Sequence, residues 1–307
     1  MGDVIACERL YKRYGWITAL KGVTLSIEPG VTGLLGPNGA GKSTLISVLL
    51  GQTPRSDGRA SVLGLDVREQ QRLIRRRVGF VPENDCVIPG LTGTGYVCYA
   101  GRLAAMSYGD SMQRAHEVLD YVGLDEARYR PVEEYSTGMK QRLKLAQALV
   151  HDPDLLLLDE PTNGMDPQGR QAMLSLITDL SRAGISVLLS SHLLPDVERV
   201  CERVVIMGGG EVLTTGRIAE MNEPHPTLYH LDFTGDVAAF RHSLEERRVR
   251  VLEAADGRFH VELPAEGTQT TVLEASQAAE VRLQRLSPKQ SSLEETFMAA
   301  IMRQGPK

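Results

Sequence analysis

The feature that most constrains this chain is a glycine-rich segment at residues 36–44, set between two regular patterns. The apolar run Val31–Leu35 precedes it and predicts a buried strand. Residues 42–50 follow with the composition of a helix, which Gly51 ends. Strand, glycine loop and helix in direct succession are the context that a phosphate-binding loop requires. The segment consists of Gly36, Pro37, Asn38, Gly39, Ala40, Gly41, Lys42, Ser43 and Thr44.

The chemistry of phosphate binding explains these residue types, which fit the pattern G-x-x-x-x-G-K-[ST]. Glycines let backbone N–H groups approach phosphate oxygens, and the positive end of the following helix dipole faces the same group. Lys42 supplies a charge for the β- and γ-phosphates, and Ser43 offers a hydroxyl to Mg²⁺. The motif predicts a site for a nucleotide phosphate, but it does not tell which reaction follows.

Length and composition limit the classes of protein to which the chain can belong. At 307 residues and 42% hydrophobic content, we expect one large domain and one small one. The net charge of −5 argues against a general nucleic-acid binder. The four cysteines form no C-x-x-C pair, which favours free thiols in a reducing compartment. No secretory leader and no apolar run of the ~20 residues that a membrane helix needs are visible, so we expect a cytosolic protein that forms no transport path by itself.

Further polar residues stand where predicted elements end. A leucine-rich strand at residues 154–158 runs into the adjacent carboxylates Asp159 and Glu160, a costly arrangement unless a metal or a reaction uses them. Another strand, residues 186–190, ends at Ser191 and His192. Considered without the other motifs, a histidine at a strand end, such as His192, is more often structural than functional.

Two other segments are ambiguous by themselves. Ser136 and Gly138 precede a helix predicted at residues 142–150, and simple N-capping is the favoured interpretation of that pattern alone. Tyr14 stands before Gly15 and is either an ordinary strand-end aromatic or a face on which adenine stacks.

Together these motifs resemble the nucleotide-binding domain of the ABC ATPases, in the right order and over about residues 3–220. The motifs that carry the resemblance are residues 36–44, 136–141, 155–160, 163–166 and His192. The segment 135–142 most resembles the separately encoded ATPase subunits of bacterial exporters. The resemblance implies an α/β fold with a RecA-like core, an antiparallel β subdomain and a helical subdomain, which we assign to residues 1–220.

The resemblance also implies roles for the nucleotide-binding residues. ATP would lie between two such domains arranged head to tail, as a homodimer or a heterodimer. One domain would give Lys42, Ser43 and the loop amides, and the other Ser136 and Gly138 at the start of a helix. Tyr14 would stack on the adenine.

The remaining roles concern the reaction. By resemblance, Asp159 holds the Mg²⁺ shell through water, Glu160 is the general base for the attacking water, and His192 contacts the γ-phosphate. Asp166 would cross the dimer and couple the two sites. Glu83, where the family usually has a glutamine, would approach the metal through oxygen while adding a negative charge.

Other departures from the family pattern are few. Thr137 and Met139 replace the usual glycine and glutamine, so side-chain contacts from these positions are in doubt. Residues 163–165 replace the usual small residues before Asp166, which we interpret as a tolerated variation.

After a linker at residues 223–226, the tail from 221 to 307 predicts a separate, small α+β domain with a ferredoxin-like fold. Its three histidines, at 230, 242 and 260, are too dispersed to predict a metal site. Ser291 or Ser292 with Glu294 or Glu295 predicts a capping box for a final helix. The hypothesis for this domain is a regulatory or dimer-supporting role. The expected elements are strand 228–233, helix 236–247, strand 249–254, a turn at 256–257, strand 258–263, helix 268–279, strand 281–287 and helix 293–302.

The sequence therefore predicts an ATP-hydrolysing subunit of an ABC exporter, peripheral on the cytoplasmic face of the cell membrane beneath separate permease subunits. One alternative is a soluble ABC ATPase that acts on a macromolecular complex such as a ribosome or DNA. Such proteins usually carry two nucleotide domains, a coiled coil or zinc modules, none of which is visible here. A small-molecule kinase would leave the segment 136–141 and His192 without a purpose.

Overall fold

The computed structural model describes residues 2–221, 224–253, 259–264, 267–290 and 292–302. These residues divide into two compact units: the first runs to Ile218 and also includes residues 297–302, and the second is Ala219–Thr296. Within the described ranges, every helix is too short or too polar to cross a bilayer.

A six-stranded sheet forms the centre of the first unit, and its strands are parallel except at one edge. All residues of β3 and β7 are buried, as expected for strands covered on both faces. The register places Leu35 opposite Ser191, and Asp159 opposite Ser190. The carboxyl ends of three central strands therefore meet at one edge, where α/β sheets bind ligands. The order is β10 (Glu211–Arg217), β9 (Arg203–Gly208), β3 (Val31–Leu35), β8 (Ser186–Ser191), β7 (Leu155–Asp159) and β6 (Val78–Val81).

A second, antiparallel sheet packs its apolar residues into the same core cluster as the central sheet. Its first two strands continue beyond their most apolar parts as far as the hairpin turn at residues 15–16, so that the first ends at Tyr14 and the second begins at Ile17. These extensions are half exposed and polar, and an apolar run alone does not reveal them. The order is β2 (Ile17–Ile27), β1 (Ile5–Tyr14), β4 (Asp57–Val62) and β5 (Leu65–Asp66).

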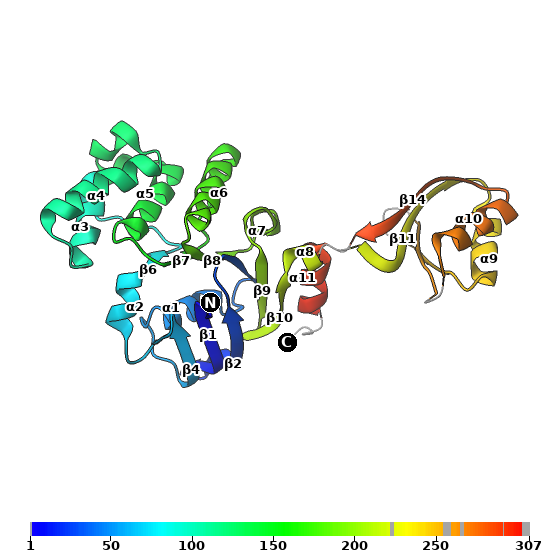
Figure 1. Ribbon diagram of the computed structural model, residues 1–307, viewed down its shortest axis with the longest axis horizontal. Helices are drawn as coiled ribbons and strands as arrows, with labels where there is room; N and C mark the ends of the chain where they lie inside the picture. The colour runs from blue at the N-terminus through cyan, green and yellow to red at the C-terminus, as the bar shows by residue number, and fades with distance from the viewer. Residues whose placement is uncertain (1, 222–223, 254–258, 265–266, 291, 303–307) are drawn as a thin grey trace. The chain divides into compact units, whose positions relative to one another are not determined.

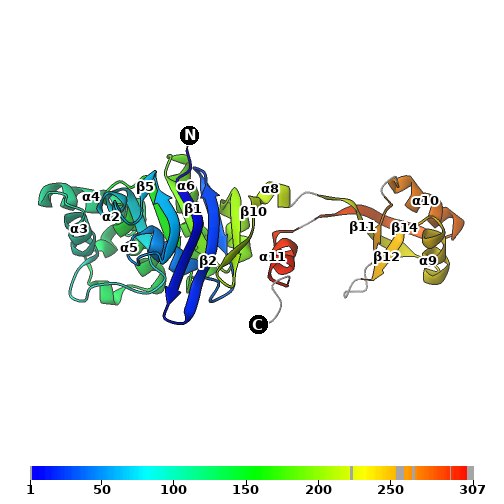
Figure 2. The same ribbon diagram turned by 90° about the horizontal axis from the view of Figure 1, so that it is seen from below.

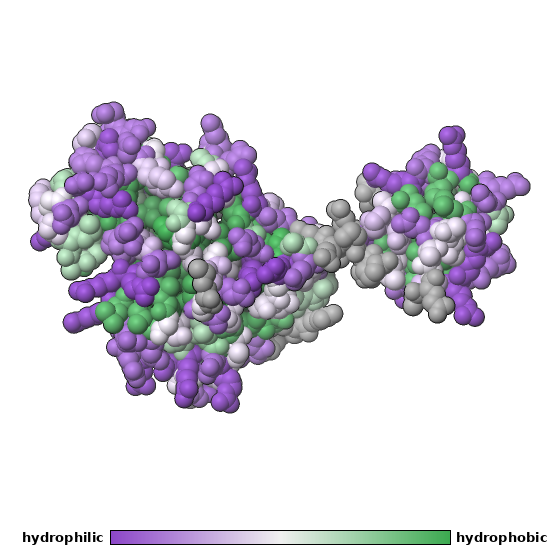
Figure 3. Space-filling view, in the orientation of Figure 1, coloured by the Kyte–Doolittle hydropathy of each residue, from purple (hydrophilic) through white to green (hydrophobic). Residues whose placement is uncertain are grey.

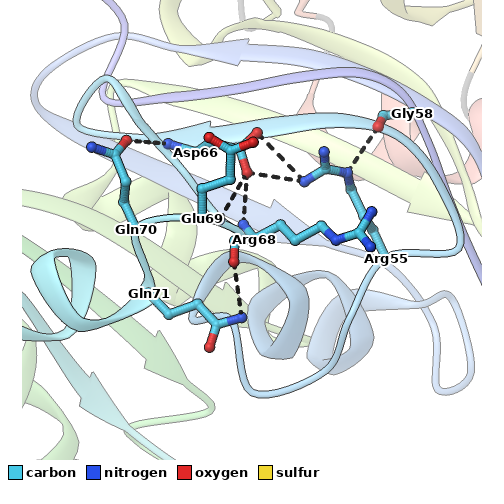
Figure 4. A network of polar contacts seen from close by, with 7 residues as sticks. All are labelled: Arg55, Gly58, Asp66, Arg68, Glu69, Gln70 and Gln71. Carbon is cyan, nitrogen blue, oxygen red and sulfur yellow. Dashed lines mark hydrogen bonds and ion pairs between the residues drawn. The ribbon is translucent and has the colours of Figure 1, made fainter.

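The carboxylate of Asp66 organises the turn from β5 into α2 (Gln71–Arg77) (Figure 4). It accepts hydrogen bonds from the backbone N–H groups of Arg68 at 2.7 Å and Glu69 at 3.2 Å. The Arg55 guanidinium lies 3.2 Å away and also donates to the Gly58 carbonyl. Burial raises the pKa of Asp66, but these hydrogen bonds outweigh it and hold that pKa below its ordinary value. Helix α2 is exposed to solvent along most of its length, and hydrophilic side chains stand out over it (Figure 3).

A group of helices lies at the end of the first unit away from β10 (Figures 1 and 2). Most residues between 92 and 130 are helical. The helix predicted at residues 142–150 instead begins at Thr137, because Ser136 caps it five residues earlier. The group comprises α3 (Gly93–Leu103), α4 (Tyr108–Tyr121), the short 3₁₀ helices Asp125–Tyr129 and Val132–Glu134, and α5 (Thr137–Leu149).

The other helices of this unit flank the central sheet or follow it in the chain. They are α1 (Lys42–Leu49), α6 (Pro167–Arg182) and α7 (Leu194–Val200). The short helix α8 (Ile218–Met221) follows β10, and its residues from Ala219 on belong to the second unit.

The second unit has the element order β-α-β-β-α-β, as predicted, with an antiparallel sheet. Pro224 was assigned to a linker but begins a strand, where it pairs with Gln290; its place as the first residue of the strand tolerates the missing N–H. Glu223 and the turn predicted at 256–257 lie outside the described residues. The sheet order is β12 (Arg250–Glu253), β13 (Phe259–Glu262), β11 (Pro224–Thr234) and β14 (Arg282–Gln290), and the helices are α9 (Val237–Glu246) and α10 (Gln269–Ala278).

The core of this unit is apolar and partly aromatic. Phe240 is 1% exposed, and its ring meets that of Phe233 edge-on at 4.7 Å between centroids. The last helix, α11 (Leu293–Met302), has the predicted bounds, and the Ser292 hydroxyl accepts a hydrogen bond from the Glu295 N–H at 3.1 Å. Ser291 lies outside the described residues.

Candidate functional site

A cavity of about 690 Å³ opens at the carboxyl edge of the central sheet. It gathers residues from five segments that are far apart in the sequence, among them the β1–β2 hairpin, the glycine loop and the ends of β7 and β8. The lining residues are Tyr14, Ile17, Ala19, Asn38, Gly39, Ala40, Gly41, Lys42, Ser43, Thr44, Glu83, Asp159, Glu160, Asn163 and His192.

The glycine loop ends at a position that only glycine fits. Gly41 precedes α1 with φ +100°, and a Cβ there would lie 2.8 Å from the Ala19 carbonyl oxygen. No side chain caps α1, so the N–H groups of its first turn have no capping acceptor. The buried ammonium of Lys42 donates to the carbonyls of Gly36 at 2.7 Å and Pro37 at 3.4 Å. Gly36 and Pro37 thus hold the lysine from behind the cavity, while the rest of the loop lines it.

Glu160 and His192 form a directly bonded pair. The Nδ1 atom of His192 lies 2.8 Å from Oε2 of Glu160. Burial raises the pKa of Glu160 above its ordinary value, and His192, followed by Lys42, opposes the rise. The backbone of Glu160 has φ +51°, a strained conformation for a residue with a side chain, and its N–H donates to the Ser190 carbonyl at 3.0 Å. The strand end therefore turns sharply to aim this carboxylate into the cavity.

Asp159 carries the chemistry expected of a metal-binding residue. It is 5% exposed and lines the cavity, yet its carboxylate has no hydrogen bond or ion pair with any residue that the structure describes. A buried carboxylate in this state needs a cation. The hydroxyl of Ser43 and the exposed side chain of Glu83 line the same cavity, and oxygen ligands of this kind suit Mg²⁺.

Of the predicted binding residues, Gly36 and Pro37 lie behind the cavity, and three others lie at helix starts outside it. Ser136 caps α5 through a hydrogen bond from the Met139 N–H at 3.3 Å, and Gly138 follows in its first turn. Asp166 caps α6 and accepts from the Gly169 N–H at 3.0 Å. The capping interpretation of Ser136 is confirmed, but capping leaves open whether a second chain uses the same helix end.

Sequence reasoning missed Ile17, Ala19 and Asn163 as lining residues. The two apolar residues could have been found only from the pairing of β2 with β1, which places them beside Tyr14. The side-chain amide of Gln141, on α5, donates to the Asn163 carbonyl at 3.1 Å and holds that loop against the helix. Trp16, the only tryptophan of the chain, is fully exposed between Tyr14 and Ile17.

The cysteines are unpaired, as predicted. Cys7, Cys98 and Cys201 are buried, and Cys86 is exposed in the loop that follows Glu83.

Known proteins are similar to this chain in sequence and in fold. A family model described as ABC transporter matches residues 20–163. The linearmycin resistance ATP-binding protein LnrL of Bacillus subtilis is 32% identical over 302 residues, which cover 96% of this chain and 97% of that protein. The daunorubicin/doxorubicin resistance ATP-binding protein DrrA of Streptomyces peucetius is 38% identical over 213 residues, 69% of this chain and 64% of the relative.

Solved structures agree with these relatives. A dimeric ATP-binding cassette in a post-hydrolysis state, bound to ADP and Pi, has a TM-score of 0.64 and 25% identity over 69% of this chain and 98% of its own. The ATP-binding subunit of an ABC transporter has a TM-score of 0.65 and 27% identity over 71% of this chain and 92% of its own. The chain therefore belongs to the ABC transporter family: it is an ATP-binding subunit that hydrolyses ATP, and it is related to the ATPases of exporters.

Proposed function

We propose that the cavity binds Mg²⁺-ATP and that a second nucleotide-binding domain completes it in a head-to-tail dimer. One observation carries this proposal. The residues expected at the reacting phosphate fall into two sets, with Lys42, Glu160 and His192 around the cavity, and Ser136 and Gly138 at a helix start outside it. The Ser136 hydroxyl caps the Met139 N–H of that helix, and the other N–H groups of its first turn, together with the positive dipole end, suit a γ-phosphate. A solved relative with the same fold is a dimer bound to ADP and Pi.

The proposed reaction is attack of water on the γ-phosphorus. Glu160 accepts the proton as the new P–O bond forms, and the bond to the β-phosphate oxygen breaks to leave ADP and inorganic phosphate. His192, held by Glu160 at 2.8 Å, orients the water and the γ-phosphate. Lys42 and the amides of the glycine loop stabilise charge on the phosphates, and Tyr14 stacks on the adenine.

Mg²⁺ fits the donor set of Ser43, Asp159 and Glu83, and when bound it neutralises charge on the β- and γ-phosphates. The isolated, buried carboxylate of Asp159 supports this assignment. Asp166, at the start of α6, is proposed to contact the partner domain and to couple the two sites.

We further propose that the transporter is an exporter. Relatives named for antibiotic resistance, such as LnrL and DrrA, support this class. Two copies, or one copy and a homologue, would lie on the cytoplasmic face beneath membrane-embedded permease subunits, with no nucleic acid as partner. ATP binding closes the dimer, and hydrolysis reopens it.

For the tail we propose a ferredoxin-like fold and a role in supporting or regulating the dimer, with the nucleotide-binding domain at residues 1–220 and the accessory domain at 221–307. The element order and the sheet order β12-β13-β11-β14 support the fold. Deletion of residues 223–307 should weaken ATP-dependent dimerisation or alter the ATPase rate. Because residues 297–302 group with the first unit, a second variant should keep residues 292–302 and replace 222–291 with a flexible linker. Unchanged values in both variants would exclude the role.

The dimer is tested by Gly138→Asp in a Glu160→Gln background. The new carboxylate at the start of α5 would repel the partner's γ-phosphate, so the chain should bind ATP but remain monomeric in size-exclusion chromatography. Gly109→Asp is the matched control, because Gly109 lies in the exposed first turn of α4. An ATP-dependent dimer of the Gly138→Asp chain would contradict the head-to-tail arrangement.

The permease is tested on detergent-solubilised membranes by capturing tagged Glu160→Gln protein with ATP. A polytopic membrane protein in stoichiometric amount is the expected result. Only ribosomal or DNA-associated proteins would move the function to a soluble ABC ATPase while leaving the chemistry intact.

A further inference from the structure

One buried cation lies beside the catalytic centre without belonging to it. Lys144, in the middle of α5, is fully buried. Its Nζ donates to three consecutive carbonyls of the loop after β6: Pro82 at 2.8 Å, Glu83 at 3.2 Å and Asn84 at 3.5 Å. An ammonium has three N–H donors and no acceptor, so one side chain satisfies all three carbonyls.

The same face of α5 holds this loop at two further points. Lys140, one turn earlier, lies 3.2 Å from the Asp85 carboxylate. Gln147 accepts a 2.6 Å hydrogen bond from the Tyr96 hydroxyl, which also lies 3.2 Å from the carbonyl of Cys86. Positions 140, 144 and 147 recur at helical spacing, so they form one stripe along the loop.

The loop matters because the Glu83 side chain lines the nucleotide cavity beside Asp159 and Glu160. Pro82, Glu83 and Asn84 belong to no helix or strand, so the backbone itself does little to fix where the Glu83 carboxylate points. A third acid at this site also adds negative charge, and the ammonium of Lys144 beneath the Glu83 backbone offsets part of it.

We propose that Lys144 is a positioning residue for ATP hydrolysis, which fixes the 82–84 loop so that Glu83 reaches the nucleotide and its metal. This inference rests on the proposed role of the cavity. Helix α5 then serves both sites of the proposed dimer. Its N-terminus carries Ser136 and Gly138 for the partner's nucleotide, and Lys144 in its middle holds the 82–84 loop at the chain's own site.

The test is a double-mutant cycle on the purified full-length chain. Lys144→Met keeps an unbranched side chain in the buried slot but removes the three donors. A misplaced Glu83 should lower kcat by about 10- to 100-fold. The KM for ATP should change by less than about threefold, because the glycine loop is untouched.

The second arm separates positioning from mere packing. The Glu83→Ala variant lacks the carboxylate that Lys144 is proposed to position. Adding Lys144→Met to it should therefore lower kcat by less than about a further threefold. Arg114→Met is the control, since it removes a half-exposed ion pair with Glu117 on α4, away from the 82–84 loop, and should leave kcat within about threefold.

Each outcome decides the inference. An unchanged kcat in Lys144→Met, or an equal loss in both backgrounds, overturns it, because packing alone does not depend on residue 83. If Lys144→Met loses its folded state by circular dichroism, Lys144→Gln, which keeps an amide donor, replaces it in the cycle. Wild type and Lys42→Ala are assayed alongside: a wild-type rate no higher than that of Lys42→Ala would count against the proposed site itself rather than against Lys144.

Discussion

Replacing Glu160 by glutamine removes the proposed proton acceptor while keeping its shape. The amide oxygen of the glutamine can still accept the 2.8 Å hydrogen bond from Nδ1 of His192, so the ring stays in place. A general base contributes about 10²- to 10⁴-fold to a rate. At about 1.4 kcal/mol per factor of ten, this corresponds to a barrier higher by about 3–5 kcal/mol. We expect a loss near 10³-fold, because the other buried carboxylate of the cavity, Asp159, is assigned to the metal.

The same change should not weaken the folded chain. Burial raises the pKa of Glu160, so its ionised form is disfavoured by folding at neutral pH, and a neutral amide relieves that cost. The variant should unfold at the same or a higher temperature than wild type.

Three measurements check the reasoning: phosphate release, thermal unfolding and ATP binding followed by the fluorescence of Trp16. This tryptophan is exposed next to two cavity-lining residues, so its emission should change when nucleotide binds. Glu134→Gln is the control, since Glu134 is exposed and pairs with the half-exposed Arg130. Turnover within about threefold of wild type, with ATP bound normally, would refute the assignment of the base.

Three further perturbations probe other parts of the chain. Lys42→Ala removes a charged donor worth about 1.5–3 kcal/mol, so the Trp16 titration should show ATP affinity lowered by about 10- to 100-fold; unaltered affinity would contradict the phosphate-binding role. Phe240→Ala should destabilise the second unit by about 3–5 kcal/mol in denaturant unfolding, and an unaffected transition would contradict its core position. Asp66→Asn should lower the free energy of unfolding by about 1 kcal/mol at neutral pH. The folded-state pKa of Asp66 is depressed, so this difference should disappear as pH falls below that pKa; a constant difference down to acid pH would contradict the hydrogen-bonding explanation.

Most of the helices and strands could be predicted because each of them has a recognisable pattern in its own stretch of sequence. The apolar runs at Val31–Leu35 and Leu155–Asp159 are buried strands, and the final helix keeps its predicted bounds of Leu293–Met302. The elements of the tail also appeared in the expected order. The cavity residues Lys42, Asp159, Glu160 and His192 were predicted from motifs, and the structure brings all four together.

The features that the sequence did not predict depend on contacts between segments that are distant in the chain. A capping serine at 136 extends α5 by a turn, and the pairing of β1 with β2 brings Ile17 and Ala19 to the cavity. The role of Lys144 is also non-local, because its three acceptors lie about 60 residues earlier in the chain. A lysine in a predicted helix is normally expected to be exposed to solvent, and only the fold shows that Lys144 is buried.

The exposure of Cys86 makes the chain suitable for site-specific labelling without engineering. Burial raises the pKa of Cys7 to about 12 and raises that of Cys201 as well, and Cys98 is buried, so a maleimide at neutral pH should react at one position. That position lies three residues after Glu83, in the loop that α5 holds. A dye or spin label placed there would report in real time whether the loop moves as ATP binds, turns over and leaves.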